Sequence, residues 1–487
     1  MLGIDLGTSA VKIVAVTSGA DVAASGSGPF ATVCELPGQA EQDPQAWMEA
    51  LRLALMELER AFGPADCGWR DRVAAIGLTA QLPTMVCSGA HGPLGRAITW
   101  KDARADGATS AALDALRRRA LYERTGMPID GRYIGPMFRH HWASRSDEVE
   151  SILGAKDYLL SMLTGQRLTD PSTAAGFGAF DLAAKRFAPD LCELWRLPPR
   201  ALPQVRPAHA LAGPLTPLAA DLLGIRAGIP VTVGAADSVS SAFAMAGLEE
   251  GIVCITMGSS TVIIDAIREA RLDPATRYLL TPHVEPGWYG REMDLLATGT
   301  GHAWLGRLLG LAQGMLDRRA AESPPGARGV TFAPYLAGGE QGALWDPSLR
   351  GAILGLTLRH TPDDIARAFL EGVGFEIRRC LDVLAETAPV RGVVVAGHLT
   401  EHATSLQMLA DILQQPVQPF PPVSPAALGA ALGALQAIAA TPQGQRTRSS
   451  WPRKVLPAAN ADTYQQLYAH YLASARACQS ADATPLV

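Results

Sequence analysis

Residues 2–15 read LGIDLGTSAVKIVA, and a copy of this stretch returns in the second half of the chain. The segment Ile4-Asp5-Leu6-Gly7-Thr8-Ser9 aligns with Ile255-Thr256-Met257-Gly258-Ser259-Ser260, and the aliphatic flanks agree as well. Each copy is an apolar strand, a Gly-Ser/Thr turn and a second apolar strand, which is the pattern of a tight β-hairpin. The recurrence predicts two halves built on one architecture.

Turns of this kind expose backbone N–H groups and hydroxyls without bulky side chains, so they can wrap a phosphate through several hydrogen bonds. Two facing turns could hold a polyphosphate between the halves. The alternative is a pair of ordinary hairpins, because short Gly/Ser turns are common in sheets. Only the first copy carries an acid, Asp5.

Composition limits the class of protein. The chain has 487 residues, with 42 Lys and Arg, 47 Asp and Glu, a net charge of -5, 48% hydrophobic residues and 18% charged ones. A chain of this length and apolarity predicts a globular protein of more than one domain. The basic residues are scattered, so we expect neither a nucleic acid nor a membrane as partner.

The residues near the N-terminus and the cysteines indicate the compartment. Asp5 lies where a secretory signal would have a continuous apolar core. The seven cysteines are dispersed, without a C-x-x-C pair, which predicts reduced thiols rather than disulfides or a zinc site. Residues 426–440 are aliphatic but shorter than the roughly 20 residues of a membrane span, so we expect a buried helix there. Together these features predict a cytoplasmic protein.

Helical and strand patterns alternate along the chain, which favours α/β layers. Asp237 and Gly247 are the expected N-cap and C-cap of one helix, and we place the domain boundary near residue 245, giving domains 1–245 and 246–487. The expected helices are 45–61, 147–164, 237–247, 363–384 with an interruption at Gly372-x-Gly374, 404–413 and 461–477. The expected strands are 72–78, 229–233, 330–336 and 390–396, and residues 441–454 are expected to be a solvated linker.

The whole chain resembles the FGGY family of carbohydrate kinases, within the actin-like ATPase superfamily, and its xylulokinase branch most of all. Besides the two hairpins, the matching segments are 40–47 (AEQDPQAW), 98–104 (ITWKDAR), 156–165 (KDYLLSMLTG), 229–237 (IPVTVGAAD), 334–338 (PYLAG), 371–373 (EGV) and 428–431 (LGAA). The resemblance implies an α/β fold of two actin-like (ribonuclease H-like) domains with a hinged cleft between them.

The resemblance also implies ATP with Mg²⁺ and a small sugar or polyol as ligands. Asp237 is the implied general base and Asp5 the implied metal ligand. The implied nucleotide contacts are Gly7, Thr8, Ser9, Lys12, Gly258, Ser259, Ser260, Gly301, Gly397 and His398. The implied sugar contacts are Gln81, Leu82, Trp100, Asp102, Arg104, Asp237 and Ser238.

Each of these residues also has a purely structural interpretation. Asp237 suits a helix N-cap, and Asp5 suits a solvated strand end. Trp100 suits a core position, while Asp102 and Arg104 could pair with each other. These alternatives stay open at the level of the sequence.

The chain also departs from the xylulokinase pattern. Leu82-Pro83 stands where that branch has Met-His, Lys101 replaces an Asn, and Ser238 follows the expected base. Gly397-His398-Leu399 replaces a run of three glycines. The sequence therefore predicts an ATP-dependent kinase of D-xylulose or a related ketose or polyol, with a homodimer as the candidate assembly. The alternative is a non-catalytic sugar- or nucleotide-binding protein derived from such a kinase.

Overall fold

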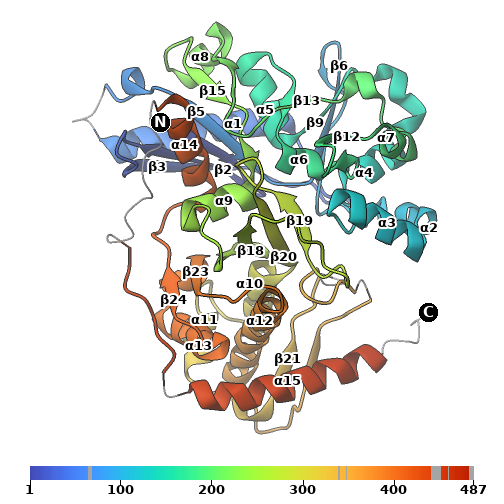
Figure 1. The fold of residues 1–487 in the computed structure, drawn as a ribbon. Coiled ribbons are helices and arrows are strands. Elements are labelled where there is room, and N and C mark those ends of the chain that lie inside the picture. The colour runs from blue at the N-terminus through green and yellow to red at the C-terminus, as the bar shows by residue number, and fades with distance from the viewer. Residues whose placement is uncertain (64–67, 338–340, 347, 440–450, 459, 482–487) are drawn as a thin grey trace.

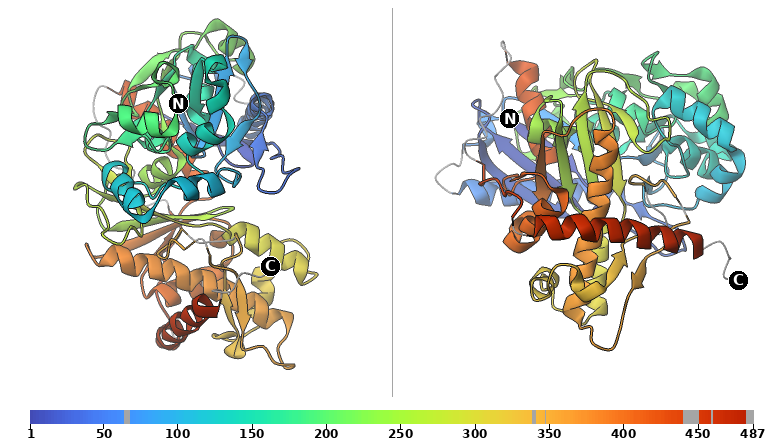
Figure 2. Two further views of the ribbon diagram at one scale, coloured as in Figure 1. Left: turned by 90° about the vertical axis from the view of Figure 1, so that its right-hand side faces the viewer. Right: turned by 60° about the horizontal axis from the view of Figure 1, so that its bottom comes forward.

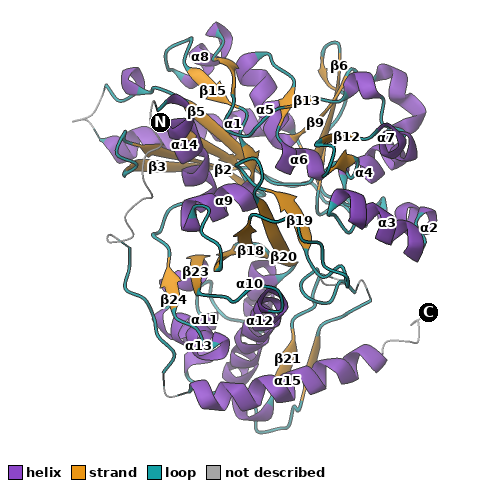
Figure 3. Ribbon diagram, in the orientation of Figure 1, coloured by secondary structure: helices purple, strands orange, loops and turns teal. Residues whose placement is uncertain are grey.

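Two β-sheets, one from each half of the chain, lie one above the other with helices between and around them (Figures 1 and 2). The computed structural model describes residues 1–487 apart from 64–67, 338–340, 347, 440–450, 459 and 482–487. Helices and strands alternate through both halves (Figure 3). The architecture is thus mixed α/β.

The first sheet has the strand order β14-β15-β5-β1-β2-β3, with β16 also paired to β5. Strands β1, β2 and β3 form an antiparallel meander, and β5 continues the sheet parallel to β1. The bounds are β1 (Leu2–Leu6), β2 (Ala10–Val16), β3 (Val22–Pro29), β5 (Ile76–Ala80), β14 (Leu211–Pro214), β15 (Pro230–Thr232) and β16 (Ala235–Ala236).

The second sheet repeats this plan in the order β19-β20-β18-β17-β23-β24. Strand β18 pairs antiparallel with both β17 and β20, and β23 lies parallel to β17 just as β5 lies parallel to β1. The bounds are β17 (Ile252–Met257), β18 (Thr261–Ile267), β19 (Leu279–Pro282), β20 (Tyr289–Leu295), β23 (Gly392–Gly397) and β24 (Val417–Pro419). The internal repeat seen in the sequence is therefore a repeat of topology.

Both predicted hairpins are present. In the first, Asp5 lies opposite Lys12, and the Gly7 N–H donates to the Ala10 carbonyl at 3.1 Å. In the second, the Gly258 N–H donates to the Ser260 carbonyl at 2.8 Å. The apolar strands on either side are buried, so each turn is held at the edge of a rigid sheet.

Helices α9 (Asp237–Ala246) and α14 (Pro425–Ile438) connect the two sheets (Figure 1). Helix α9 is rich in Ala and Ser, and α14 is rich in Ala and Gly. Both contribute to one apolar cluster that also includes residues of β2, β17, β18 and β23. A methyl group added at Gly77 of β5 would lie 1.9 Å from the Ala430 carbonyl oxygen, and one added at Gly429 would lie 1.9 Å from the Ser240 carbonyl oxygen. Backbone packs directly on backbone here, which only glycine permits. Although α14 follows residue 246, in space it packs on the first sheet.

Long helices cover the outer faces. Helix α1 (Pro44–Phe62) packs on β3. Helices α12 (Pro362–Ala385) and α13 (Ala403–Leu413) pack against the second sheet, and α15 (Ala461–Ala481) packs on α12 and α13. Further helices are α2 (Asp106–Ala112), α3 (Ala115–Thr125), α4 (Ile134–His141), α5 (Ala155–Thr164), α6 (Pro171–Ala175), α7 (Pro189–Trp195), α8 (Pro217–Leu223), α10 (Thr298–Leu308) and α11 (Leu316–Ala321). A smaller sheet of the first half contains β4 (Glu41–Gln42), β6 (Thr84–Gly89), β7 (Gly92–Pro93), β8 (Ala97–Thr99) and β9 (Ser151–Gly154). Short pairs are formed by β10 (Leu168–Thr169) with β13 (Gln204–Val205), β11 (Phe180–Asp181) with β12 (Arg186–Phe187), and β21 (Thr331–Ala333) with β22 (Ala352–Leu354).

Most of the predicted elements are confirmed within a few residues, including the helix within the aliphatic stretch, which is α14. Two predictions were wrong. Residues 147–164 contain the strand β9 before the helix α5, because the segment from Ser151 pairs with β6. Helix α12 runs without a break through Gly372 and Gly374, whose missing side chains admit the Phe332 carbonyl and the Ile412 side chain. Much of the expected linker 441–454 lies outside the described residues.

The contact between β5 and α14 yields a stability test. We expect Gly77→Ala to lower the free energy of unfolding by about 1–3 kcal/mol, because the added methyl group forces α14 away from the sheet. Gly306→Ala is the matched control, since Gly306 lies within α10 and no described atom comes within 4 Å of the position of a new Cβ. Thermal and urea unfolding of both variants measure the difference; equal stabilities would contradict this packing.

Candidate active site

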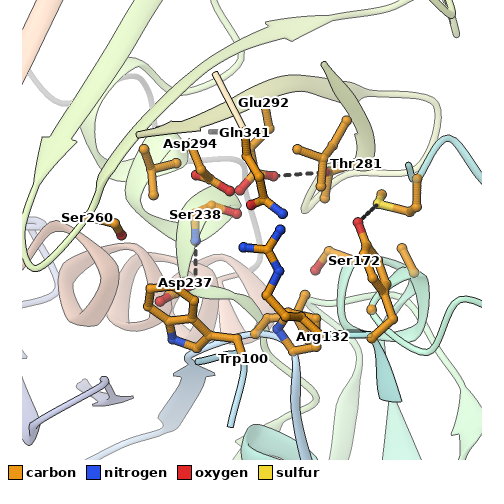
Figure 4. Close-up of a pocket in the computed structure, with 18 of the residues that line it drawn as sticks. Trp100, Arg132, Ser172, Asp237, Ser238, Ser260, Thr281, Glu292, Asp294 and Gln341 are labelled. Atoms are coloured by element: carbon orange, nitrogen blue, oxygen red, sulfur yellow. Dashed lines mark hydrogen bonds between the residues drawn. The ribbon is translucent and has the colours of Figure 1, made fainter. Parts of the chain in front are cut away.

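A cavity of about 120 Å³ lies where the two halves meet (Figure 4). Thr8 from the first hairpin turn, Ser260 from the second turn and Asp237 from the start of α9 all line it. The wall also includes Leu82, Pro83, Trp100, Met127, Arg132, Tyr133, Ser172, Ala175, Gly176, Ser238, Val262, Leu279, Thr281, Glu292, Asp294, Leu296 and Gln341. The cavity therefore brings residues of both hairpin turns together with Asp237.

Asp237 is the first residue of α9 rather than its N-cap, so the N-cap interpretation was wrong. Ala236 occupies the cap position, and no side chain there satisfies the helix N-terminus. One oxygen of Asp237, Oδ1, accepts a hydrogen bond from the Ser238 N–H at 3.0 Å. This bond orients the carboxylate while the side chain keeps part of its surface on the cavity.

The electrostatics around Asp237 oppose its ionisation. Burial, followed by the negative charges of Asp5 and Glu292, raises the pKa of Asp237 well above its ordinary value. A carboxylate with a raised pKa is a stronger proton acceptor than an exposed one. A cation bound beside Asp5 would counter part of this effect.

A buried ion cluster fixes the backbone that leads to Asp237. Lys156 is fully buried, and its Nζ lies 2.6 Å from Asp157 Oδ1, 3.3 Å from Asp170 Oδ1 and 3.0 Å from the Val233 carbonyl oxygen. Although burial lowers the pKa of Lys156, the two carboxylates raise it above its usual value, so the amine is charged. Lys156, held by Asp157 and Asp170, thus fixes the backbone at Val233, four positions before Asp237.

Asp170 carries this support further. Its carboxylate accepts hydrogen bonds from the backbone and side chain of Ser172 at the start of α6. The Ser172 Oγ in turn accepts a hydrogen bond from the Ala236 N–H at 2.9 Å. Both sides of the 233–236 loop are therefore tied to one charged cluster.

Removal of the central cation tests this role. We expect Lys156→Met to lower stability by about 3–5 kcal/mol, because it leaves buried carboxylates without a counter-charge, and to reduce kcat through misplacement of Asp237. The exposed Lys454→Met is the matched control and is expected to match the wild type. Urea unfolding and steady-state assays measure both effects; a Lys156→Met enzyme with wild-type stability would rule out the cluster as a support.

Asp5 is suited to a cation. Its side chain is 4% exposed, Ser424 Oγ donates to its Oδ2 at 3.3 Å, and its Oδ1 has no hydrogen-bond partner among the described residues. Burial raises the pKa of this carboxyl, and the charge of Lys12 and the bond from Ser424 lower it only in part. Mg²⁺ commonly takes one or two carboxylates and completes its shell with water and phosphate oxygens, so a single Asp is a sufficient protein ligand. The described residues contain no cluster of three or more His, Cys, Asp or Glu side chains arranged for a metal.

The residues expected on the sugar side divide into two groups. Leu82, Trp100 and Ser238 line the cavity, whereas Gln81, Asp102 and Arg104 do not. Gln81 is 2% exposed, and its Nε2 donates to Gln42 Oε1 at 2.7 Å. Gln42 Nε2 donates to the Thr8 carbonyl at 2.9 Å, so Gln81 reaches the first turn through Gln42.

Asp102 and Arg104 pair with each other, as the structural interpretation allowed. Arg104 Nη2 lies 2.7 Å from Asp102 Oδ2 and 2.5 Å from Glu41 Oε1, and the Ala40 N–H also donates to Asp102 at 2.9 Å. Although burial by itself raises the pKa of Asp102, the hydrogen bonds from Arg104 and Ala40 lower it overall. The pair joins the segment around residue 40 to the loop that carries Trp100.

The second turn is packed from two sides. A methyl group added at Gly299 would lie 2.0 Å from the Gly258 carbonyl oxygen, and one at Gly397 would lie 2.0 Å from that of Met257. Gly397 also has φ +104°, which excludes other residues. The expected nucleotide residue Gly301 faces the Leu336 and Phe369 side chains inside the second half.

His398 lies beside the second turn in a group of ionisable residues. Its Nδ1 is 3.3 Å from the Met257 carbonyl oxygen, and its ring centre is 5.4 Å from that of His302. His302 Nε2 lies 2.7 Å from Asp317 Oδ2. Burial lowers the pKa of His398, so this ring is neutral at pH 7.

Reasoning from the sequence missed the polar residues that face Asp237 across the cavity. Glu292 and Asp294 alternate along β20, so both point from the same face of the second sheet. Arg132 comes from the loop before α4, and Gln341 from the second half. Acids at two alternate positions of one short strand are costly to bury unless they meet a partner or a ligand, and this pattern was the available signal.

Comparison with known proteins gives the family. Residues 1–244 match the N-terminal domain model of the FGGY family of carbohydrate kinases, and residues 253–440 match its C-terminal domain model. A glycerol kinase of Gloeobacter violaceus is 30% identical over 452 residues, covering 89% of this chain and 87% of its own. A gluconokinase of Bacillus licheniformis is 26% identical, covering 86% and 83%. The crystal structure of xylulose kinase from Rhodospirillum rubrum has a TM-score of 0.85 and 31% identity, covering 99% of both chains.

The chain belongs to the FGGY family of carbohydrate kinases. The resemblance and the two-domain α/β fold are thereby confirmed, and the protein is a sugar kinase of this family. Within the described part of the chain, every helix is too short or too polar to cross a lipid bilayer.

Proposed function

We propose that this protein transfers the γ-phosphate of ATP to a hydroxyl of D-xylulose or a related ketose or polyol, with Asp237 as the general base. The observation that carries the proposal is the shared wall of the cavity, where Asp237 lies together with Thr8 and Ser260 from the two turns. Phosphoryl transfer requires mainly positioning and charge neutralisation. These three residues would position the reacting groups, while Lys12 and a Mg²⁺ ion held by Asp5 would neutralise charge.

Asp237 accepts the proton of the attacking hydroxyl through the carboxylate oxygen that does not bind the Ser238 N–H. The hydroxyl oxygen then forms its bond to the γ-phosphorus as the bond to the leaving ADP oxygen breaks. The backbone and hydroxyl groups of Gly7, Thr8, Ser9, Gly258, Ser259 and Ser260 hold the phosphates, with Lys12 as a counter-charge. Asp5 would bind Mg²⁺, which neutralises phosphate charge when bound.

The acceptor lies against Leu82, Trp100 and Ser238. Gln81 and the Asp102–Arg104 pair act as positioning residues for the first turn and for the Trp100 loop. Gly301, Gly397 and His398 belong to the adenosine side. The boundary near residue 245 separates the unit that supplies Asp237 from the unit that supplies the second turn, and closure of the two units excludes water.

The acceptor class rests on two lines of support. The xylulose kinase of known structure has the greatest identity among the three relatives named above. The cavity is also small, at about 120 Å³, which suits a sugar or polyol. ADP release with a panel of ketoses and polyols tests the assignment, and tight sugar binding without ADP release would favour the non-catalytic alternative.

The base role predicts a specific kinetic defect. We expect Asp237→Asn to lower kcat by about 10² or more while ATP and acceptor still bind, because only the proton acceptor is lost. Asp221→Asn on the exposed surface of α8 is the control. Steady-state kinetics and calorimetric binding separate the two effects; an Asp237→Asn enzyme with wild-type kcat would remove this residue from the mechanism.

The raised pKa of Asp237 predicts a pH effect. The base works when it is deprotonated, so kcat/KM is present above its pKa and is lost as the pH falls through it. Glu292→Gln removes one of the charges that raise this pKa, so we expect the acid limb of the kcat/KM profile to move to lower pH. A pH series on both enzymes measures the limb; movement to higher pH would contradict the electrostatic coupling.

A further inference from the structure

Glu292 faces the cavity from the second half of the chain. Thr281 Oγ1 donates to Glu292 Oε2 at 2.7 Å (Figure 4). The Ser238 side chain also hydrogen-bonds to this carboxylate. The residue is 7% exposed, and its remaining surface lies on the cavity wall. A buried carboxylate in this position is an acceptor of hydrogen bonds from an incoming ligand.

Carboxylates outnumber cations on the cavity wall. Among the described residues that line the cavity, the carboxylates are Asp237, Glu292 and Asp294, and the one cation is Arg132. Asp130 already accepts hydrogen bonds from Arg132 Nε at 3.0 Å and Nη2 at 2.5 Å. The wall therefore offers an excess of hydrogen-bond acceptors and a cation that is already compensated.

Arg132 is fixed by its neighbours as well as neutralised. Gln341 Nε2 donates to Asp130 Oδ2 at 3.2 Å, so the carboxylate that holds Arg132 also bridges the two halves. Asp106 lies close behind, where burial and the charge of Asp130 raise its pKa to about 6. A ligand carboxylate could accept only from the groups of Arg132 that Asp130 leaves open, and it would share the charge of this cation with Asp130.

We propose that Glu292 is a specificity-determining residue of the acceptor cavity. Its carboxylate binds hydroxyls of a neutral polyhydroxy acceptor and repels acceptors that carry a carboxylate. This inference rests on the proposed function and narrows its substrate class. Hydroxyls donate to Glu292 and Asp294, and they can accept from the Nη1 group of Arg132. A sugar acid would bury a fourth carboxylate beside Asp237, Glu292 and Asp294, where repulsion or proton uptake must follow.

The proposed role of Glu292 distinguishes two substrate classes, neutral sugars and sugar acids, that overall sequence similarity does not distinguish. The gluconokinase of Bacillus licheniformis and the xylulose kinase of Rhodospirillum rubrum match this chain over most of its length. The wall charges of the present chain favour the neutral class of acceptor. Rejection here depends on a repulsive element as well as on attractive contacts.

Matched pairs of acceptors test the inference on the full chain. Erythritol with D-erythronate, xylitol with D-xylonate, and sorbitol with D-gluconate differ within each pair by a terminal carboxylate. We expect the best neutral acceptor to exceed its matching acid by at least about thirtyfold, both in kcat/KM and in calorimetric affinity. An acid that binds within threefold of its neutral partner would overturn the inference.

Glu292→Gln tests the residue itself. We expect the preference for the neutral acceptor to fall at least about tenfold, because the amide removes one repulsive charge while it keeps a similar shape. The exposed Glu193→Gln is the matched control and should keep the wild-type ratio. An unchanged ratio in a folded Glu292→Gln protein would also overturn the assignment.

The two proposals fail in different ways. ADP release that is absent with every acceptor contradicts the proposed kinase function, whereas the calorimetric ratio still reports on Glu292. Equal phosphorylation of neutral and acidic acceptors contradicts the role of Glu292 and leaves the kinase function intact.

Discussion

Direct contact between backbones in the layer of α9 and α14 is the constraint on which the site depends. Added methyl groups at Gly3, Gly77 and Gly429 would each lie less than 2 Å from a carbonyl oxygen of a neighbouring element. The small residues of these helices therefore bring the first sheet, α14 and α9 closer together than ordinary side chains permit. Asp237 is the first residue of α9, so this packing determines how far the acid lies from the two turns. The Ser424 N-cap of α14 also reaches Asp5, which connects the same layer to the first hairpin.

Buried ion pairs hold the parts of the site that the apolar core does not fix. The Lys156 cluster holds the loop before Asp237, and the Asp102–Arg104 pair holds the loop of Trp100. In the second half, Arg291 of β20 pairs with Asp265 of β18, its Nε lying 3.0 Å from Asp265 Oδ1. Each pair is hydrogen-bonded on several sides, which is the condition under which buried charge specifies one geometry instead of only weakening the fold. The loops held by Lys156 and by the Asp102–Arg104 pair are not strands of the main sheets, so ion pairs give these two loops the rigidity that a sheet gives the hairpins.

The cavity combines groups from both halves, and its chemistry belongs to neither half alone. The first half supplies Asp237 and Arg132, while the second half supplies Glu292, Asp294 and Ser260. The negative charge of Glu292 raises the pKa of Asp237, so the wall opposite the acid also adjusts its basicity. Base strength and acceptor choice are in this way coupled through one carboxylate.

Local pattern was enough to predict the duplicated hairpins, the α/β alternation, most of the long helices and Asp5 as an unusual acid, because strand period, helix period and turn chemistry act over a few residues. Asp237 was singled out as a base by the family resemblance, since its local pattern suited a helix N-cap. Local pattern failed at Ser151–Gly154, where pairing with β6 overrides an apolar run that also suits a helix, and at Gly372 and Gly374, whose role is to admit a carbonyl and a side chain from elsewhere. The family resemblance, and not local pattern, implied Gln81, Asp102 and Arg104 as sugar contacts. In the structure Gln81 and Asp102 have hydrogen-bond partners in the segment of residues 40–42. The meeting of Arg132, Glu292 and Gln341 with Asp237 was decided by tertiary structure alone, because groups separated by more than fifty residues become neighbours only when two sheets pack on one shared layer of helices.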